Sequence, residues 1–585
     1  MSSISIIKPY FAENRSRILV GLVSLILVDM LQLIVPRVIK WAVDDLTLLR
    51  VDSGRLLVYA LSIAGIAILI GAFRYVWRLC LLGTSRRVEE GLRNRLFDHL
   101  QTLSAAYFDR TRTGDLMAHA TNDIQQIRMA AGMGLVALND AVVMGAAAIG
   151  FMLYIEPTLT AVVLVPMPFI AVAARFFSRR MHRRYRSVQA SFSDLTEAVR
   201  ERVAGIRLIK AHNRKTAEAE KIETASRVYV DENLSLVRIT GAFFPMMVLL
   251  TNLSMALVLF LGGRQTILHT ITPGDFVAFI SYLGLLMWPM MALGWVTNLI
   301  QRGRASLDRV DAILATRPDI HSAAAARPLR EPAGAIVFEG VGFSYPGGAG
   351  TQTRAALSGI DLRIEPGAVL GIVGPPGSGK TTMLSLIPRL YDPSAGRILI
   401  GGLDIRAVPV ENLRGRIAFM PQEPFLFAGT LRNNITFGDP GVDDERITEA
   451  ARAAALLHTI RLFPQGFDTV VGERGVMLSG GQKQRVALAR CLLTPAPVMI
   501  LDDPISQVDF ETGALITQTI RRLAGARTIL IVSHRLSAVR FADRILVLNG
   551  GRVVQTGRHA DLLAAKGYYA VTHRLQEVEE GCDAA

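Results

Sequence analysis

Six long apolar stretches precede residue 300 of this 585-residue chain, and they limit what the chain can fold into. A helix needs about 20 consecutive apolar residues to cross a bilayer. The stretches run near residues 18–35, 56–77, 133–155, 159–177, 243–261 and 276–296. We therefore predict a membrane half of six spanning helices. The fourth is the weakest because Pro166 and Pro168 interrupt it, although neighbouring helices can satisfy the freed carbonyls.

The links between these stretches differ in length and in charge. Residues 82–132 and 178–241 form two long links, and the other links are short; the long links hold most of the Lys and Arg residues that lie between the stretches. A positive excess marks the cytoplasmic side. The N-terminus and the second half of the chain are then cytoplasmic too. Each long link breaks at a short cross-piece, at residues 108–116 and 205–212, and we expect these pieces to touch the second half; an ordinary helix-to-helix loop is the alternative.

The overall composition fits a membrane protein. The chain is 51% hydrophobic, and its net charge of +14 lies mostly between the apolar stretches, which favours a membrane over nucleic acid as the partner. Cys80, Cys491 and Cys582 are scattered and odd in number, so they indicate no disulfide framework and no metal site. The N-terminus enters a long apolar run without a small-residue cleavage site, so we expect no removed signal peptide.

The second half has the pattern of a different domain. Residues 316–334 are rich in Ala, Pro and Arg and lack periodicity, which predicts a linker after a membrane domain of residues 1–315. From residue 335, strand-like runs alternate with helical runs, which predicts an α/β domain over residues 335–575. Residues 576–585 are expected to form a flexible acidic tail.

A phosphate-binding loop follows the apolar strand at residues 369–373. Glycines let backbone N–H groups turn inward to hold phosphate, and the helix that follows adds its partial positive charge. Lys380 should reach the β- and γ-phosphates of ATP, and Thr381 should ligate Mg²⁺. The expected ATP-binding residues of this loop are Gly374, Pro375, Pro376, Gly377, Ser378, Gly379, Lys380, Thr381 and Thr382.

Two acids close the apolar strand at residues 498–501. Asp502 should hold Mg²⁺, directly or through water, and Asp503 stands where a catalytic base or a water-orienting carboxylate belongs. A base must lie within hydrogen-bond reach of its water. Asp is shorter than Glu, so its carboxylate falls back by about 1.5 Å, and misplacements of that order cost about 100-fold in rate.

Three more residues gain meaning from their place in this series. His534 follows the strand at residues 528–532 and could contact the γ-phosphate. Gln422 follows the strand at residues 417–420 and could sense Mg²⁺ and the attacking water. Tyr345 could stack on adenine. Alone, each of these residues would more often have a structural role.

A second anion-binding segment precedes the helical run at residues 483–492. It consists of Leu478, Ser479, Gly480, Gly481 and Gln482. The N-terminus of a helix attracts anions. One nucleotide does not need two such sites from one domain, so we infer that this segment binds the nucleotide of another domain.

The whole series resembles the ATP-binding-cassette (ABC) family in its exporter arrangement, and the match covers nearly the whole chain. The resemblance implies a type IV exporter fold: six membrane helices extended into the cytoplasm, then an α/β P-loop ATPase domain. It identifies Tyr345 as the adenine-stacking residue, Gly374 to Thr381 as Walker A and Gln422 as the Q-loop residue. It also identifies Leu478 to Gln482 as the signature, Asp502 as the end of Walker B, Ser506 to Asp509 as the D-loop and His534 as the switch histidine.

Two departures from the family pattern point to one type of exporter. Asp503 replaces the catalytic Glu, and Gln507 stands in the D-loop where a small residue is common. Both resemble the degenerate-site subunit of heterodimeric multidrug-type exporters. In that family two half-transporters form composite ATP sites, each from one Walker loop and the other chain's signature.

The resemblance also implies a function and a place in the cell. The expected activity is ATP-driven export of small amphipathic or hydrophobic compounds through the inner membrane, with ATP and Mg²⁺ as cofactors. The expected partners are a second half-transporter and the bilayer, with no nucleic acid. An importer on the same fold and a membrane-bound ATP sensor remain alternatives, whereas the apolar stretches exclude a soluble ATPase of DNA repair or translation.

Polar residues inside the membrane half are costly and should face the bundle or water. Asp29 lies within the first stretch, and Asn139 and Asp140 lie within the third. Contact with substrate and a structural partner are both open for them. A set of methionines offers an adaptable apolar lining or plain packing: Met246, Met247, Met255, Met287, Met290 and Met291.

Overall fold

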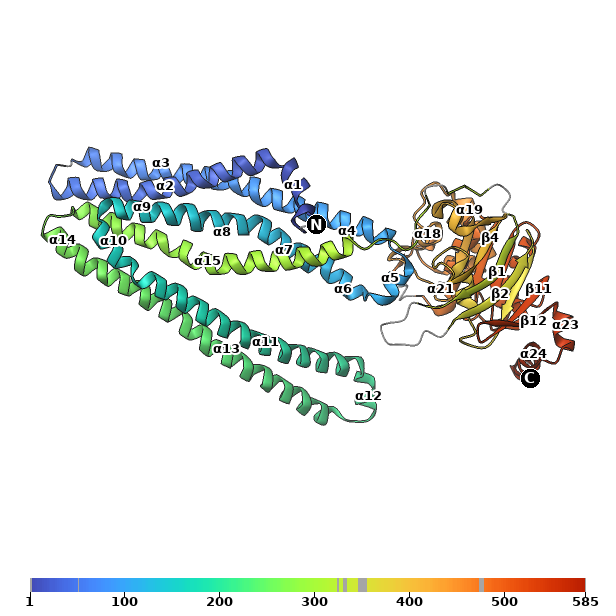
Figure 1. Cartoon of the computed structure of the whole chain (residues 1–585). Helices are drawn as coiled ribbons and strands as arrows, with labels where there is room; N and C mark the ends of the chain where they lie inside the picture. The colour runs from blue at the N-terminus through green and yellow to red at the C-terminus, as the bar shows by residue number, and fades with distance from the viewer. Residues whose placement is uncertain are drawn as a thin grey trace. The chain divides into compact units, whose positions relative to one another are not determined.

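The computed structural model describes residues 3–50, 52–323, 326–329, 334–345, 355–472 and 478–583. These residues form two compact units (Figure 1). The first comprises Met1–Gln101 and Gly114–Thr316, and the second comprises Thr102–Thr113 and Arg317–Ala585. The second unit therefore includes a short piece of the first long link together with the α/β half.

The first unit is helical in its described residues, and three of its long runs contain π-helical turns. Its elements are η1 (Ser3–Ile6), α1 (Lys8–Glu13), α2 (Arg15–Thr47), α3 (Ser53–Trp77), η2 (Arg78–Leu82), α4 (Gly83–Thr102), α6 (Thr113–Ala118), η3 (His119–Asp123), α7 (Ile124–Met129), η4 (Ala130–Gly134), α8 (Leu135–Asn139), η5 (Asp140–Met144), α9 (Gly145–Ile155), α10 (Pro157–Leu164), α11 (Pro166–Ala204), α12 (Ile206–Ala211), α13 (Lys215–Leu257), η6 (Val258–Gly262), α14 (Gly263–Ile267) and α15 (Pro273–Leu314).

Four helical runs in the described part of the chain are long and apolar enough to cross a membrane: Arg15–Thr47, Ser53–Thr102, Thr113–Ile155 and Lys215–Ile267. They contain the first, second, third and fifth predicted stretches. The sixth lies in α15, whose segment Pro273–Leu286 is a shorter apolar helix. The fourth is divided between α10 and α11. The division falls at Pro166, because proline has no N–H to continue a helix and its ring collides with the preceding turn.

The long helices of this unit pair side by side. α2 packs against α3 and α15, and α11 packs against α13. Figure 1 shows α11 and α13 as an antiparallel pair joined by α12. The core between α2 and α15 includes Tyr282, whose hydroxyl donates a 2.9 Å hydrogen bond to the carbonyl of Leu33. A hydroxyl buried among apolar groups needs such a partner.

The second unit contains the predicted α/β domain. Its elements are α5 (Ala105–Arg110), β1 (Ile336–Phe343), β2 (Leu357–Ile364), β3 (Val369–Val373), α16 (Lys380–Leu386), β4 (Ala395–Ile400), β5 (Leu403–Asp404), η7 (Ile405–Ala407), α17 (Val410–Arg414), β6 (Ile417–Met420), β7 (Gly429–Thr430), α18 (Leu431–Thr436), α19 (Asp444–Ala453), α20 (Leu457–Leu462), η8 (Gly466–Asp468), β8 (Val470–Val471), α21 (Gly480–Leu493), β9 (Val498–Asp502), α22 (Phe510–Leu523), β10 (Thr528–Val532), η10 (Leu536–Ala538), β11 (Arg544–Asn549), β12 (Arg552–Gly557), α23 (His559–Ala564) and α24 (Tyr568–Asp583).

Its main sheet has six strands in the order β12-β11-β3-β10-β9-β6. Every neighbouring pair is parallel except β11 with β12. β3, β9 and β10 are buried along their whole length, as expected for parallel strands covered on both faces. A second, antiparallel sheet has the order β2-β1-β4-β5. The carboxyl ends of β3, β10, β9 and β6 therefore share one edge.

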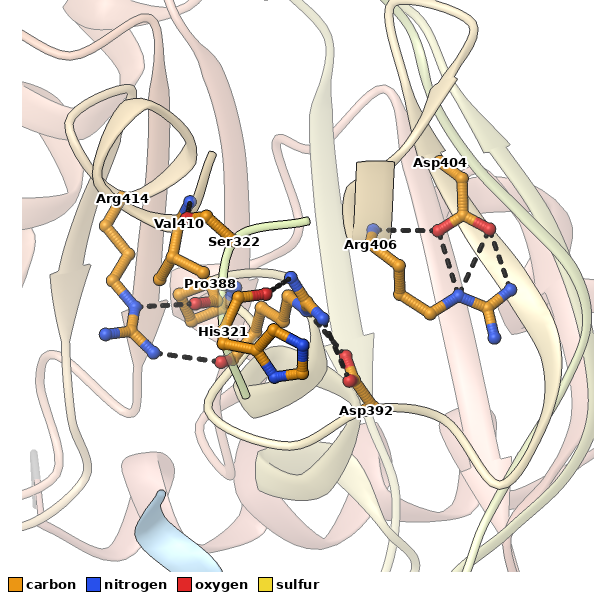
Figure 2. Close-up of polar contacts among 9 residues, drawn as sticks. His321, Ser322, Pro388, Asp392, Asp404, Arg406, Val410 and Arg414 are labelled. Atoms are coloured by element: carbon orange, nitrogen blue, oxygen red, sulfur yellow. Dashed lines mark hydrogen bonds and ion pairs between the residues drawn. The ribbon is translucent and has the colours of Figure 1, made fainter. Parts of the chain in front are cut away.

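The predicted linker is irregular but bound to the α/β half. Arg389 donates a 3.2 Å hydrogen bond to the carbonyl of His321 and pairs with Asp392 at 2.7 Å. The hydroxyl of Ser322 accepts a 3.0 Å hydrogen bond from the N–H of Val410. Figure 2 shows His321, Ser322 and Val410 close together, with Asp392 nearby. The linker from Arg317 onward thus belongs structurally to the second unit.

The C-terminal end of the described chain is helical. Helix α24 continues to Asp583 and so includes residues 576–583, which the sequence analysis assigns to the tail. One cause is a tertiary contact, since Gln576 hydrogen-bonds the backbone of residues that follow β10. Such a contact stabilises a helix that its own polar sequence would leave marginal.

Candidate functional site

The shared edge of the main sheet brings the predicted site residues together. β3 leads into Gly374, β9 ends at Asp502, and β10 is followed by Ser533 and His534. β6 pairs with β9 and is followed two residues later by Gln422. Ligands of open α/β sheets bind at the carboxyl ends of the strands. The four segments thus meet where such a ligand would lie.

The phosphate-binding loop needs its glycines for close backbone approach. A Cβ on Gly374 would lie 2.1 Å from the carbonyl oxygen of Leu548, and one on Gly379 would lie 2.6 Å from that of Ala356. Gly379 also has a φ of +98°, which side chains rarely adopt. No other residue type fits these two positions without moving the backbone.

Lys380 is buried inside this loop. Its Nζ donates hydrogen bonds to the carbonyls of Gly374 at 2.8 Å and Pro375 at 2.9 Å. Burial lowers the pKa of Lys380, whereas the charges of Asp502 and Asp503 oppose that shift. The ammonium group therefore lies where phosphate oxygens would come within its reach.

Asp502 has the surroundings of a cation ligand. The residue is 1% exposed, and neither carboxylate oxygen has a hydrogen-bond partner of normal geometry among the described residues. Burial raises the pKa of Asp502, while Thr381 and Lys380 act to lower it. A buried carboxylate without partners is costly. A hard cation such as Mg²⁺ between Asp502 and Thr381 would remove that cost, so the residues present fit the ion.

Asp503 has an unusual backbone and a partner that the sequence does not suggest. Its φ is +56°, in the left-handed region that Asp tolerates better than most residues. Its N–H donates to the carbonyl of Val532 at 2.8 Å, and its Oδ1 accepts a 3.1 Å hydrogen bond from the hydroxyl of Ser533. With 4% of its surface exposed, the short carboxylate is held by the neighbouring strand end.

Three other residues predicted for this ATP site are exposed. His534 is exposed, and its charge lowers the pKa of Asp502. Gln422 is exposed at the same edge. Tyr345 is 41% exposed, and its hydroxyl lies 3.1 Å from that of Thr382, next to the phosphate loop. The ring thus has an open surface beside the loop, as an adenine-stacking residue requires.

The signature segment lies on a different group of helices. Ser479 caps α21, and its side chain and that of Gln482 exchange hydrogen bonds with each other's backbone N–H at 3.3 Å and 2.9 Å. α21 packs against α18, α19 and β6, whereas α16 packs against β9 and β10. The structure therefore does not bring the signature to the phosphate loop of its own chain.

Comparisons with known proteins agree with this geometry. Residues 18–290 match the model for the ABC transporter transmembrane region, and residues 357–506 match the model for the ABC transporter. The multidrug resistance-like ATP-binding protein MdlA of Escherichia coli (strain K12) is 36% identical over 98% of this chain and 97% of its own length. The chain belongs to the ABC transporter family.

Other relatives of this ABC transporter are equally long. The probable multidrug resistance ABC transporter protein YheI of Bacillus subtilis (strain 168) is 34% identical over 98% of each chain. An ATP-dependent lipid A-core flippase of Thiobacillus denitrificans is 34% identical over 95% of each. A solved bacterial Atm1-family ABC exporter with ATP bound has a TM-score of 0.77 and 28% identity, over 96% of this chain and 98% of that one. The transporter is thus a multi-pass inner-membrane protein with a cytoplasmic ATPase domain.

One predicted cross-piece of the transporter contacts the ATPase domain. α5 belongs to the second unit, and Asp109 on it accepts a 2.7 Å hydrogen bond from the hydroxyl of Tyr391. The second cross-piece, at residues 205–212, contains α12 and belongs to the first unit. Its docking on an ATPase domain stays a prediction.

Two polar residues of the membrane half, Asp29 and Asn139, contact each other within the helix bundle. Asp29 is 3% exposed and accepts a 3.1 Å hydrogen bond from Asn139. This contact favours a structural role for Asp29. Met246 packs against the core of the first unit and Met255 is exposed. The side chains of the methionines at 247, 287, 290 and 291 lie outside the described residues.

Sequence reasoning missed several residues that hold the site. Ser533 follows a buried strand at the site edge, but its contact with Asp503 depends on the pairing of β9 with β10, which the local sequence does not display. Gln484 donates to the carbonyl of Asp503 and to the hydroxyl of Ser506 and accepts from the N–H of Gln507. Its burial on α21 could not be read from the sequence. Tyr391 and Gln576 act through long-range contacts that carry no local pattern.

Proposed function

We propose that this ABC transporter exports small amphipathic or hydrophobic compounds, drugs or lipids, as one half of a heterodimer. The names of its relatives support the substrate class, since they describe multidrug resistance-like proteins and a lipid A-core flippase. The proposal that the two ATP sites hydrolyse ATP at unequal rates rests on the environment of Asp503.

The transporter's own site has the groups needed to bind ATP with Mg²⁺. Lys380 lies within the phosphate loop and would exchange loop carbonyls for phosphate oxygens. Asp502 and Thr381 would hold Mg²⁺, which neutralises charge that develops on the phosphates. Tyr345 would stack on adenine, His534 would contact the γ-phosphate, and Gln422 would sense the ion and water.

Hydrolysis at this site would be slow. A base has to reach the attacking water, and Asp503 is both one bond shorter than Glu and engaged by Ser533 at 3.1 Å. Its backbone, at φ +56°, directs the side chain towards the end of β10. A carboxylate held in this way would be poorly placed to act as the base for the attacking water.

The signature of this chain is intact and would complete a partner's site. Ser479 starts a helix of 14 residues, whose N-terminus favours anions. A partner with Glu at the position of Asp503 would then perform most of the turnover, while the nucleotide in this chain's Walker loop would stay bound for longer. A homodimer with two slow sites is the rival arrangement.

The test is ATP-dependent transport of labelled amphipathic dyes into inside-out vesicles, with and without a co-expressed second half-transporter. Export predicts uptake into these vesicles, and the heterodimer predicts uptake only when both chains are present. Uptake by this chain alone at the full rate would contradict the heterodimer. Efflux from the vesicles would identify an importer, and ATP binding without dye movement in any combination would favour a sensor.

A further inference from the structure

One side chain on the last helix holds the loop that carries His534 at two points. Gln576 on α24 donates a 2.7 Å hydrogen bond from Nε2 to the backbone carbonyl of His534. Its Oε1 accepts a 2.9 Å hydrogen bond from the backbone N–H of Leu536. The side-chain amide thus satisfies a C=O and an N–H that lie two residues apart, which fixes the direction of the chain between them.

The same segment is held from two other sides. Ser533 donates to Asp503, and Arg535 donates a 3.0 Å hydrogen bond from Nη1 to the carbonyl of Val508 in the D-loop. These contacts join the segment to the strand end and to the D-loop. Gln576 adds the C-terminal helix as a third support.

The imidazole of His534 depends on this support. The residue is exposed, so the position from which its side chain extends is set by the backbone rather than by packing. A small rotation of the segment would change where the imidazole lies relative to the phosphates. Misplacements of about 1 Å have large effects at such sites.

We propose that Gln576 is a positioning residue for His534. Gln576 fixes the backbone on both sides of Arg535 and so sets the contact between the imidazole and the γ-phosphate. Because ADP lacks that phosphate, this contact sets the preference of the site for ATP over ADP. The inference rests on the proposed role of His534 as the γ-phosphate contact. It gives α24 a part in the nucleotide site, beyond its packing on the domain.

The test measures equilibrium binding of ATP and ADP, each with Mg²⁺, to the full chain in lipid nanodiscs. Gln576→Met keeps the length of the side chain and removes both hydrogen bonds. We expect the preference for ATP over ADP to fall by about three- to tenfold, the range for one or two net hydrogen bonds, with ADP affinity unchanged. Hydrogen–deuterium exchange of residues 534–538 should become faster. Val578→Ala, an exposed position on the same helix, is the matched control.

A second pair of variants separates positioning from general loss of structure. In a His534→Ala background, Gln576→Met should lower the preference no further, because it acts through His534. The inference is wrong, and the proposed function stands, if Gln576→Met weakens the binding of ATP and of ADP equally. The same holds if Gln576→Met keeps the wild-type preference for ATP while His534→Ala loses it. If His534→Ala itself keeps the preference, the proposed role of His534 fails, and the inference fails with it.

Discussion

The hydroxyl of Tyr391 donates a 2.7 Å hydrogen bond to the carboxylate of Asp109, across 282 residues of chain. Burial and the charge of Asp109 both raise the pKa of Tyr391, so the hydroxyl keeps its proton at neutral pH. The ring of Tyr391 also packs edge-on against Tyr345, with centroids 5.4 Å apart. Tyr391 therefore connects the cross-piece α5 to Tyr345, the expected adenine-stacking residue.

Tyr391→Phe should weaken the coupling of ATP use to transport. The variant keeps the ring packing and loses only the hydrogen bond to Asp109, so we expect unchanged ATP affinity and a two- to tenfold lower substrate-stimulated ATPase rate, about the value of one such bond. Asp109→Asn, which keeps an acceptor, should be milder. Equal activity of wild type and Tyr391→Phe in vesicles would show that this contact does not serve coupling.

Lys380→Ala should abolish ordered ATP binding at this chain's own site. The substitution removes the ammonium group that binds Gly374 and Pro375 inside the loop and that phosphate would engage. Charge-assisted bonds of this kind are worth about 1.5–3 kcal/mol each, so affinity should fall at least about tenfold. Crosslinking of a photoreactive nucleotide measures the loss. Lys566→Asn, at a left-handed position that Asn tolerates, is the control.

Asp502→Asn should stabilise the nucleotide-free protein and abolish Mg²⁺-dependent stabilisation by ATP. Burial raises the pKa of Asp502, so its charge destabilises the folded state at pH values above that raised pKa. This destabilisation is relieved as the pH falls through the pKa of Asp502 in the folded state towards the ordinary pKa of Asp, about 3.9. Thermal unfolding against pH, with and without Mg²⁺ and ATP, measures both effects. A lower melting temperature of Asp502→Asn without nucleotide would contradict the assignment.

Ser479→Ala and Asp503→Ala should have unequal effects on the ATPase rate of the heterodimer. Loss of the Ser479 hydroxyl removes a helix cap, worth about 1 kcal/mol, from the segment that completes the partner's active site, so activity should fall about fivefold. Asp503→Ala should change the rate far less. Ser479→Thr keeps the cap and should restore most of the activity. Equal damage from both Ala variants would favour a homodimer with two equivalent sites.

The local sequence pattern predicted the phosphate loop and the two acids at the end of β9, Asp502 and Asp503. Each comes directly after a short apolar strand that the sequence displays. The split in the fourth stretch was also visible, since Pro166 marks it. The partner of Asp503 was not predictable, because Ser533 reaches it only through the pairing of β9 with β10. The helix through residues 576–583 was missed for a similar reason, since its anchor on Leu536 lies 40 residues away.

Gly480 and Gly481 of the signature differ in how strictly the structure excludes a side chain at each position. A Cβ on Gly481 would lie 2.4 Å from the backbone carbonyl of Gln507, so no substitution there escapes a collision. A Cβ on Gly480 would meet only the end of the Gln507 side chain, at 2.1 Å. A shorter residue at 507 would remove that obstacle. Gly481 should therefore stay glycine in functional descendants of this chain, whereas at Gly480 the obstacle within the chain itself disappears once position 507 has changed.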